Sequence, residues 1–177
     1  MSGGSKALLA LGIAVLVVIG GAGVYLALSK NTGTAKVSMY VKDLPATWSS
    51  VNVTFSSVEI HQSGAGNQSG WHTLPITNQT IDLSSLVNVS ALLASGNVQA
   101  GNYTQIRLVV SSVVGVMANG TIVNFKVPSG ELKTTHPFQL VAGSTTVFTV
   151  DIDLAHSIVQ TANGWTFTPV LGSITQS

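Results

Sequence analysis

The chain has 177 residues, of which 7 % are charged, and seven Lys and Arg against six Asp and Glu leave a formal net charge of +1. So few cations cannot form a basic patch, which excludes electrostatic binding of nucleic acid. The absence of cysteine excludes disulfides, cysteine-ligated metal centres and thiol catalysis. A hydrophobic fraction of 45 % is too high for an intrinsically disordered chain.

The first predicted element is an uncharged apolar stretch, Ala7–Leu28. As a helix it would reach roughly 33 Å at about 1.5 Å per residue, which is enough to cross the hydrocarbon core of a bilayer. We therefore predict a leader with a transmembrane or filament-core helix over 1–30, a linker over 31–35 and an extracellular domain over 36–177. The residues expected to contact lipid or neighbouring helices are Leu8, Leu9, Leu11, Ile13, Val15, Leu16, Val17, Val18, Ile19, Val24, Tyr25, Leu26 and Leu28.

Three fates of this segment stay open. In the first case it is a permanent single-pass anchor. In the second case it is cleaved near Gly20–Ala22 by a secretory peptidase. The new N-terminus then carries Val24, Leu26 and Leu28, whose alternation is typical of a strand that can be donated to a neighbour's sheet. In the third case the segment is processed as a pilin, because Lys6-Ala7-Leu8-Leu9 before a long apolar run resembles an archaeal type IV prepilin. That resemblance implies cleavage between Ala7 and Leu8, with Lys6 in the leader, and helices packed in a filament core.

After the linker, apolar residues recur with period two, which predicts β-strands. Val37, Met39 and Val41 form one set, and Val51, Val53 and Phe55 form the next. The phase then shifts to Val58 and Ile60, so we expect a β-bulge near Ser56–Ser57. A loop over 63–70 and short strands over 71–74 and 80–83 follow, and 83–95 is the candidate helix outside the membrane segment.

The second half of the domain repeats the strand pattern. Asn119-Gly120 lies between strands predicted near 113–118 and 121–127 and is a signal for a type I′ hairpin turn. Another buried face consists of Phe148, Val150, Ile152 and Leu154, and a last strand over 165–174 is broken by Pro169. About eight strands in all predict an all-β fold, an antiparallel two-sheet sandwich preceded by one N-terminal hydrophobic helix.

Several motifs occur in a fixed order: Thr80-Ile81-Asp82-Leu83, Ala91-Leu92-Leu93, the run from Ala100 to Val110, Val127-Pro128-Ser129-Gly130, Asp151-Ile152-Asp153 and Pro169-Val170. Over residues 36–174 they resemble an uncharacterised family of secreted and membrane-anchored β-sandwich domains, a domain of unknown function found in archaeal and bacterial envelope proteins. The resemblance implies the fold and a location in the envelope, and it implies no activity.

Six of the ten asparagines lie in Asn-x-Ser/Thr sequons, where about two would be expected by chance. They are Asn52, Asn67, Asn78, Asn88, Asn102 and Asn119. The excess predicts N-linked glycans on a domain outside the membrane. Turns rich in Ser and Thr also contain such sequons without being glycosylated. Asn88 lies in a segment expected to be packed and is the weakest candidate of the six.

The acidic residues offer one candidate metal site. Asp151 and Asp153 are expected to project from the same outer face, and with Asp82 they could supply oxygen ligands to calcium. The alternative is that they bond to loops or pair with Arg107, the single arginine. Glu59 and His61 share a face, whereas the other histidines are dispersed. No nucleophile elbow and no phosphate loop is present, so we expect no enzyme activity and no cofactor.

Two aromatic features have structural interpretations. Tyr103 follows a Gly-Asn turn and resembles a tyrosine corner, in which the hydroxyl bonds back to the backbone. Trp48, Trp71 and Trp165 could form a platform for sugars, but tryptophans so far apart in the sequence more often fill the ends of a sandwich, and we favour the core.

The sequence predicts a structural protein of the cell surface, an archaeal pilin-like glycoprotein that forms extracellular filaments through its hydrophobic N-terminal segment. The expected partners are membrane lipid, further copies of the chain and N-linked glycans, with no nucleic acid. Two alternatives remain: a membrane-anchored binding or adhesion module, or accessory subunit of a membrane complex, and a secreted filament subunit joined by donation of an N-terminal strand.

Overall fold

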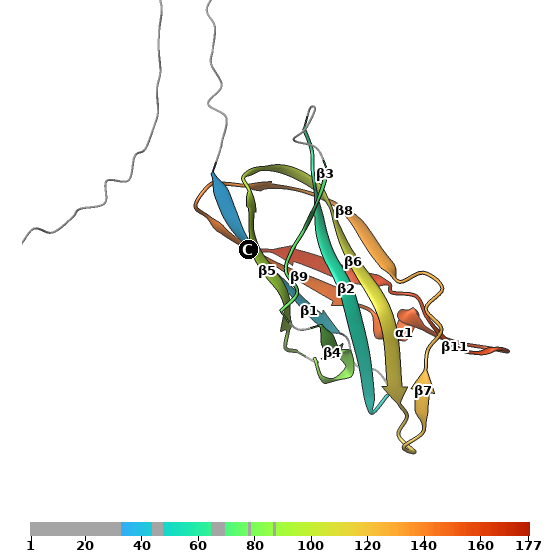
Figure 1. The fold of residues 1–177 in the computed structure, drawn as a ribbon. Helices are drawn as coiled ribbons and strands as arrows, with labels where there is room; N and C mark the ends of the chain where they lie inside the picture. The colour runs from blue at the N-terminus through green and yellow to red at the C-terminus, as the bar shows by residue number, and fades with distance from the viewer. Residues whose placement is uncertain (1–32, 44–47, 65–69, 78, 87) are drawn as a thin grey trace, which may run out of the picture. The chain divides into compact units, whose positions relative to one another are not determined.

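The computed structural model describes residues 33–43, 48–64, 70–77, 79–86 and 88–177, and Figure 1 shows that this part of the chain consists mainly of β-strands. The predicted N-terminal helix and its processing residues Lys6, Ala7 and Leu8 lie outside the described residues. Among the helices that are described, none has the length and apolar character needed to span a membrane.

The described strands are β1 (Thr34–Asp43), β2 (Ser50–Gln62), β3 (Gly70–Thr73), β4 (Thr80–Asp82), β5 (Ala91–Gln99), β6 (Gly101–Val116), β7 (Ile122–Asn124), β8 (Glu131–Leu140), β9 (Thr145–Ile152), β10 (Ile158–Thr161), β11 (Gly164–Phe167) and β12 (Leu171–Gln176). Two short helices join them: η2 (Leu83–Ser85), a single 3₁₀ turn, and α1 (Leu154–Ser157). The prediction of about eight strands merged or missed some of these. β1 begins at Thr34, inside the predicted linker.

The larger sheet is built around the long antiparallel pair β2 and β6, which runs from the pair Ser50–Val116 to the pair Gln62–Tyr103. β3 and β4 pair with the other side of β2, and β7 and β8 pair with the other side of β6. All of these pairs are antiparallel.

The smaller sheet has the strand order β12-β9-β1-β5. Here β1 and β9 are parallel, with Lys36 opposite Thr145 and Asp43 opposite Ile152, so the prediction of a purely antiparallel sandwich is wrong at this pair. The period of an apolar pattern carries no information on strand direction, and these two strands are far apart in the sequence. The two-stranded sheet of β10 and β11 completes the described fold.

One apolar core joins the inward faces of the two larger sheets, which gives a sandwich-like arrangement. The predicted inward residues are all buried: Val37, Met39 and Val41 in β1; Val51, Val53, Phe55, Val58 and Ile60 in β2; and Phe148, Val150, Ile152 and Leu154 in and after β9. The predicted bulge is confirmed, because the β2–β6 register shifts between Thr54 and Ser57. An extra residue there allows both halves of β2 to face the core.

The candidate helix over 83–95 is largely wrong. Its first three residues form η2, with Asp82 as the N-cap, but Ala91–Gln99 is the strand β5, which pairs with β1. Leu93 and Ala94 are buried in that strand, so tertiary pairing outweighs the helical propensity of the Ala- and Leu-rich sequence.

The hairpin between β6 and β7 is confirmed, but its turn is not type I′. That turn needs positive φ at both central residues, and here Gly120 has φ 84° whereas Asn119 does not have a positive φ. The amide of Gly120 donates to the carbonyl of Met117 (2.9 Å), and Met117 in turn donates to Thr121 (2.9 Å). A three-residue loop with glycine in the left-handed region therefore replaces the two-residue loop.

Candidate functional site

The structure shows the surroundings of Tyr103 and of the tryptophans. The Tyr103 hydroxyl donates to the carbonyl of Gln99 across the β5–β6 connection (2.7 Å), so the tyrosine corner is confirmed. Burial raises the pKa of Tyr103 to about 12, which keeps its hydroxyl a donor at ordinary pH. Trp48 and Trp165 contact each other edge to face, with ring centroids 5.1 Å apart, and both pack against the core.

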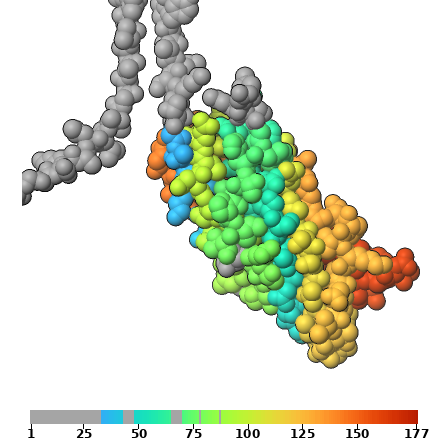
Figure 2. All heavy atoms as spheres, viewed as in Figure 1, coloured from blue at the N-terminus to red at the C-terminus, as the bar shows by residue number. Residues whose placement is uncertain are grey.

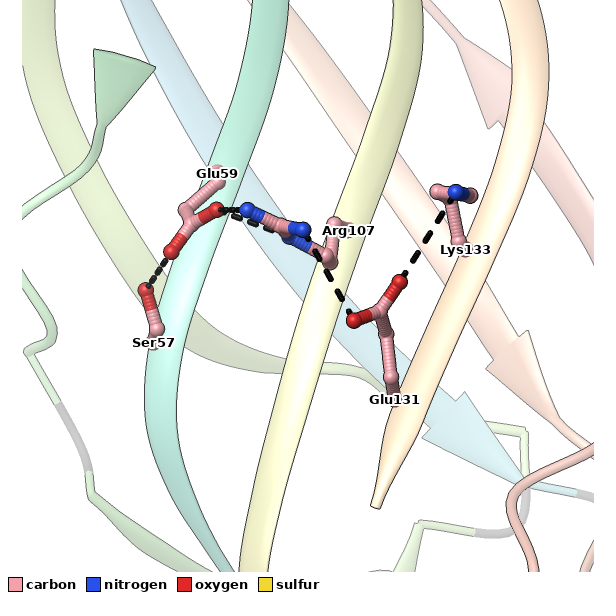
Figure 3. A network of polar contacts seen from close by, with 5 residues as sticks. All are labelled: Ser57, Glu59, Arg107, Glu131 and Lys133. Carbon is pink, nitrogen blue, oxygen red and sulfur yellow. Dashed lines mark hydrogen bonds and ion pairs between the residues drawn. The ribbon is translucent and has the colours of Figure 1, made fainter. Parts of the chain in front are cut away.

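The third tryptophan, Trp71, belongs to a polar cluster on the outward face of the larger sheet. The centre of this cluster is a set of five residues, here called the outer-face network: Ser57, Glu59, Arg107, Glu131 and Lys133 (Figure 3). They come from β2, β6 and β8, which lie side by side because Glu59 pairs with Arg107 and Arg107 pairs with Lys133 in the strand register. Figure 2 shows β2 and β6 as neighbouring teal and yellow bands on the face in view.

Arg107 connects the two carboxylates of the network. Its Nε donates to Oε2 of Glu59 at 2.8 Å, and its Nη2 makes a second bond to the same oxygen. Its Nη1 lies 3.6 Å from Oε2 of Glu131, whose other oxygen lies 3.9 Å from Nζ of Lys133. On the far side, the Ser57 hydroxyl donates to Oε1 of Glu59 (2.6 Å).

Aromatic rings cover part of this network. The guanidinium carbon of Arg107 lies 4.0 Å from the centre of the Trp71 ring, which is the geometry of a cation–π contact. His61 meets the edge of Trp71, with centroids 5.1 Å apart, and its Nδ1 lies 3.2 Å from the Thr104 hydroxyl. The Glu59 side chain is 16 % exposed and that of Arg107 is 24 % exposed. The ion pair between Arg107 and Glu59 is therefore mostly shielded from water.

The surroundings of Glu59 in the network favour the charged form of its carboxyl group. Burial alone would raise the pKa of Glu59, but the hydrogen bonds from Ser57 and Arg107 and the positive charge of Arg107 outweigh it and leave the pKa below its ordinary value. A general acid working near neutral pH needs a shift in the opposite direction. This arrangement holds three strands in register and keeps Glu59 ionised.

The three acids proposed as calcium ligands do not form one cluster, because the described part of the chain contains no group of three or more Asp, Glu or His side chains that could hold a metal. Asp82 caps η2 and also accepts a bond from the amide of Val51 (2.8 Å). Asp151 is buried rather than exposed, because Lys42 lies 3.2 Å from its carboxylate and Gly172 lies against it.

Asp153 caps α1 and bonds to both the amide and the ring of His156, at 3.1 Å and 2.7 Å. The hydrogen bond from the His156 ring lowers the pKa of Asp153 and outweighs the opposing effect of burial. Of the alternatives left open for these acids, local bonding is therefore observed for Asp82 and Asp153. Arg107 pairs with the two glutamates instead, because the strand register places them beside it.

The sequons lie in different environments. Asn88, Asn102 and Asn119 are exposed, and Asn88 has a left-handed backbone with φ 60°. Asn119 lies in the β6–β7 turn, where its side-chain oxygen accepts a bond from the amide of Thr121 (3.0 Å). Asn52 is half-buried in β2 between β4 and β6, and Asn67 and Asn78 lie outside the described residues.

A groove of about 490 Å³, which the sequence did not predict, opens beside the bulge of β2. Ser56 and Ser57 form one side, and Thr73, Pro75, Ile76 and Gln79 are among the residues on the other. The groove lies between the points where β3 and β4 pair with β2, so it follows from the interruption of pairing along that edge. The phase shift at Ser56–Ser57 is the sequence signal that could have indicated it.

Comparison with known proteins gives one match. Residues 34–169 match the sequence profile of a family described as a domain of unknown function, DUF4382. The resemblance to an uncharacterised domain family is thus confirmed, whereas the pilin-like leader falls outside the matched residues and stays a prediction. No curated protein and no solved structure matches the chain.

Proposed function

We propose that this chain, which belongs to the DUF4382 family, is a structural protein of the cell surface that is assembled through its hydrophobic N-terminal segment. The observation that carries the proposal is the uncharged segment Ala7–Leu28, placed immediately before a β-domain whose first strand begins at Thr34. In this view the segment is the core of an extracellular, pilin-like filament, and the β-domain faces outward.

The positions of the sequons support a location outside the membrane. Asn88, Asn102 and Asn119 are exposed, so glycans attached there would not disturb the core. Glycans would also supply the hydration that a chain with 7 % charged residues provides poorly. Asn52 is half-buried in a strand that is paired on both sides, and its modification stays a prediction.

The polar side chains of the larger sheet also favour a structural role. In the outer-face network, Glu59, Arg107 and Glu131 bond to one another (Figure 3), and none of these three lines the groove beside the bulge. Such a network stabilises the alignment of β2, β6 and β8. A subunit of a surface polymer needs a rigid body of this kind more than it needs a reactive group.

The test is the intact mass and N-terminal sequence of the protein isolated from its native envelope, together with electron microscopy of the cell surface. A mature N-terminus at Leu8, attached glycans and visible filaments are the expected results. A start at Gly23 would support the secreted subunit with a donated strand, and an intact Met1 without filaments would support the anchored module. Recovery of a sugar-free chain from the cytosol would overturn the proposal.

A matched pair of variants tests the segment itself. Val17→Lys places a charge in the middle of the apolar stretch and should abolish recovery of the chain with membranes or filaments. Thr135→Lys adds the same charge at an exposed position of β8 and should leave recovery unchanged. Equal recovery of the two variants would show that the segment does not anchor or assemble the protein.

A further inference from the structure

Among the strands that the structure describes, β12 forms one edge of the smaller sheet and pairs with β9 alone. Its six residues, Leu171–Gln176, include no charged side chain and no proline. An edge strand exposes a row of unpaired backbone N–H and C=O groups, and natural proteins usually protect such a row with charges, proline, short length or a covering segment. A β-bulge is another such device, and the β12–β9 register does shift between Leu171 and Ser173. Over Ser173–Gln176, however, the described part of the chain shows none of these devices.

The other edge strands that the structure describes are protected. β8 carries Glu131, Lys133 and Pro137. β5 is covered by the segment 75–77, in which Thr77 donates to the carbonyl of Leu93 (2.7 Å) and Pro75 accepts from the amide of Ser95 (3.1 Å). β3, β4, β7, β10 and β11 have four residues or fewer. β12 therefore differs from every other described edge.

The hydrogen bonds show which groups of β12 remain open. Ser177 and Val147 exchange two backbone bonds of 2.8 Å and 3.0 Å. Bonding alternates along an antiparallel pair, so Thr175 and Ser173 also bond toward β9, whereas Ile174 and Gln176 direct their N–H and C=O groups to the open side. The Ile174 side chain still packs against the core.

We propose that β12 is an interface at which two copies of the chain pair edge to edge, antiparallel and related by a two-fold axis. The two four-stranded sheets would then continue into each other. A second copy is the partner that fits, because an uncharged edge with alternating open groups is complementary to itself when it is rotated by 180°. No like charges meet across the pair.

The proposed contact between two β12 strands is small, so it needs conditions that bring copies of the chain close together. A pair of six-residue strands buries much less than the roughly 1,200–2,000 Å² of a stable protein–protein interface. The pairing therefore depends on a high local concentration, which the proposed assembly through the N-terminal segment would supply. To this extent the inference rests on the proposed function.

The geometry gives a direct test by cysteine cross-linking, since the chain has no cysteine. Three registers pair the open groups around the strand centre, and they place Ser173 opposite Ser173, Ser173 opposite Thr175, or Thr175 opposite Thr175. In each case the pair is the non-hydrogen-bonded type, with Cα atoms about 4.5 Å apart, which a disulfide can bridge. Both side chains are exposed.

The experiment uses the full chain in its native envelope and, separately, the purified full chain at high concentration. Ser173→Cys, Thr175→Cys and a mixture of the two are treated with a mild oxidant, and dimers are measured by non-reducing electrophoresis. We expect at least one of the three to give several times more dimer than Thr135→Cys, a cysteine at another exposed position, on the protected edge of β8. Where the dimer forms through Thr175→Cys or through the mixture, Gln176 lies opposite another β12 residue, and adding Gln176→Pro, which removes an outward N–H, should lower that yield.

Two results would overturn the proposal. One is a dimer yield from every β12 cysteine no higher than that from Thr135→Cys, in both preparations. The other is cross-linking of Thr175→Cys to Leu26→Cys of another copy without dimers between β12 cysteines, because the edge would then accept a donated N-terminal strand. The purified preparation separates this test from the proposed function, because a chain that proves not to be membrane-bound can still be cross-linked at high concentration.

Discussion

Arg107 holds the outer-face network together, because one guanidinium group binds Glu59, lies near Glu131 and stacks on Trp71. Arg107→Met would leave the mostly buried Glu59 carboxylate without its cation. We expect the free energy of unfolding to fall by about 1–3 kcal/mol, which is less than for a fully buried pair because water reaches part of the site. Denaturant unfolding of the full chain measures the loss.

A double variant separates the unpaired charge from lost packing. Glu59→Gln combined with Arg107→Met removes the carboxylate that the single variant leaves unpaired, so it should recover part of the lost stability. If the double variant is as unstable as the sum of the two single variants, the ion pair is not coupled and this account of the network is wrong.

A second prediction for a single residue concerns Tyr103. Tyr103→Phe keeps the stacked contact with Phe138 and removes the bond to the carbonyl of Gln99. We expect a loss of about 1 kcal/mol, seen as a lower denaturation midpoint. Tyr40→Phe is the matched control, because Tyr40 is half-buried and its hydroxyl has no bond within the described part of the chain. Equal shifts of the denaturation midpoint in the two variants would contradict the assignment of Tyr103 as a tyrosine corner.

The turn of the β6–β7 hairpin depends on the backbone conformation of a single glycine. Gly120 has φ 84°, a conformation that costs about 1–2 kcal/mol for a residue with a Cβ. Gly120→Ala should lower stability by that amount, whereas Gly120→Asn should cost less, because asparagine tolerates left-handed backbone. Thermal unfolding of the two variants is the measurement, and an unchanged midpoint for Gly120→Ala would contradict the assigned turn.

Local patterns predicted those elements whose structure depends on their own side chains. The apolar alternation in β1, β2 and β9 predicted strands, and the phase shift at Ser56–Ser57 predicted the bulge. β8 was missed because Pro137 and a run of polar residues interrupt its apolar positions. β5 was mistaken for a helix because its strand conformation comes from pairing with β1, which the local sequence does not encode.

The candidate site was harder to predict for the same reason. Glu59 and Arg107 are 48 residues apart, and only the register between β2 and β6 brings them together. The acids chosen from spacing, Asp151 and Asp153, lie close in the sequence but have different partners, because β9 ends at Ile152 and Asp153 caps the next helix. Tyr103 was predicted because its partner lies four residues away.

For the whole molecule, stability at low pH should depend on few groups. The pKa values of Glu59 and Asp153 are both lowered in the folded state. Their contribution is therefore fully present above the ordinary carboxyl range, near pH 4, and is lost as the pH falls through the lower folded values. We expect a nearly constant free energy of unfolding from pH 7 to 5 and a decline below about pH 4.

The variant Glu59→Gln with Asp153→Asn tests this assignment. Asparagine can still cap α1, so the fold should persist while the decline in acid becomes shallower. Lys133→Gln, which changes the charge of the network without adding or removing a group that titrates in acid, should keep the wild-type decline. A double variant with an unchanged acid profile would show that other groups control it.

The position of β1 inside the smaller sheet has a mechanical consequence. A pull on Thr34 acts along a strand that is paired on one side with β5 and on the other with β9. Extracting it would load both ladders in shear at the same time, instead of peeling bonds one by one as at an edge. If the domain were held by its N-terminal end, a pulling force would therefore act on a strand that is bonded to a neighbour on each side.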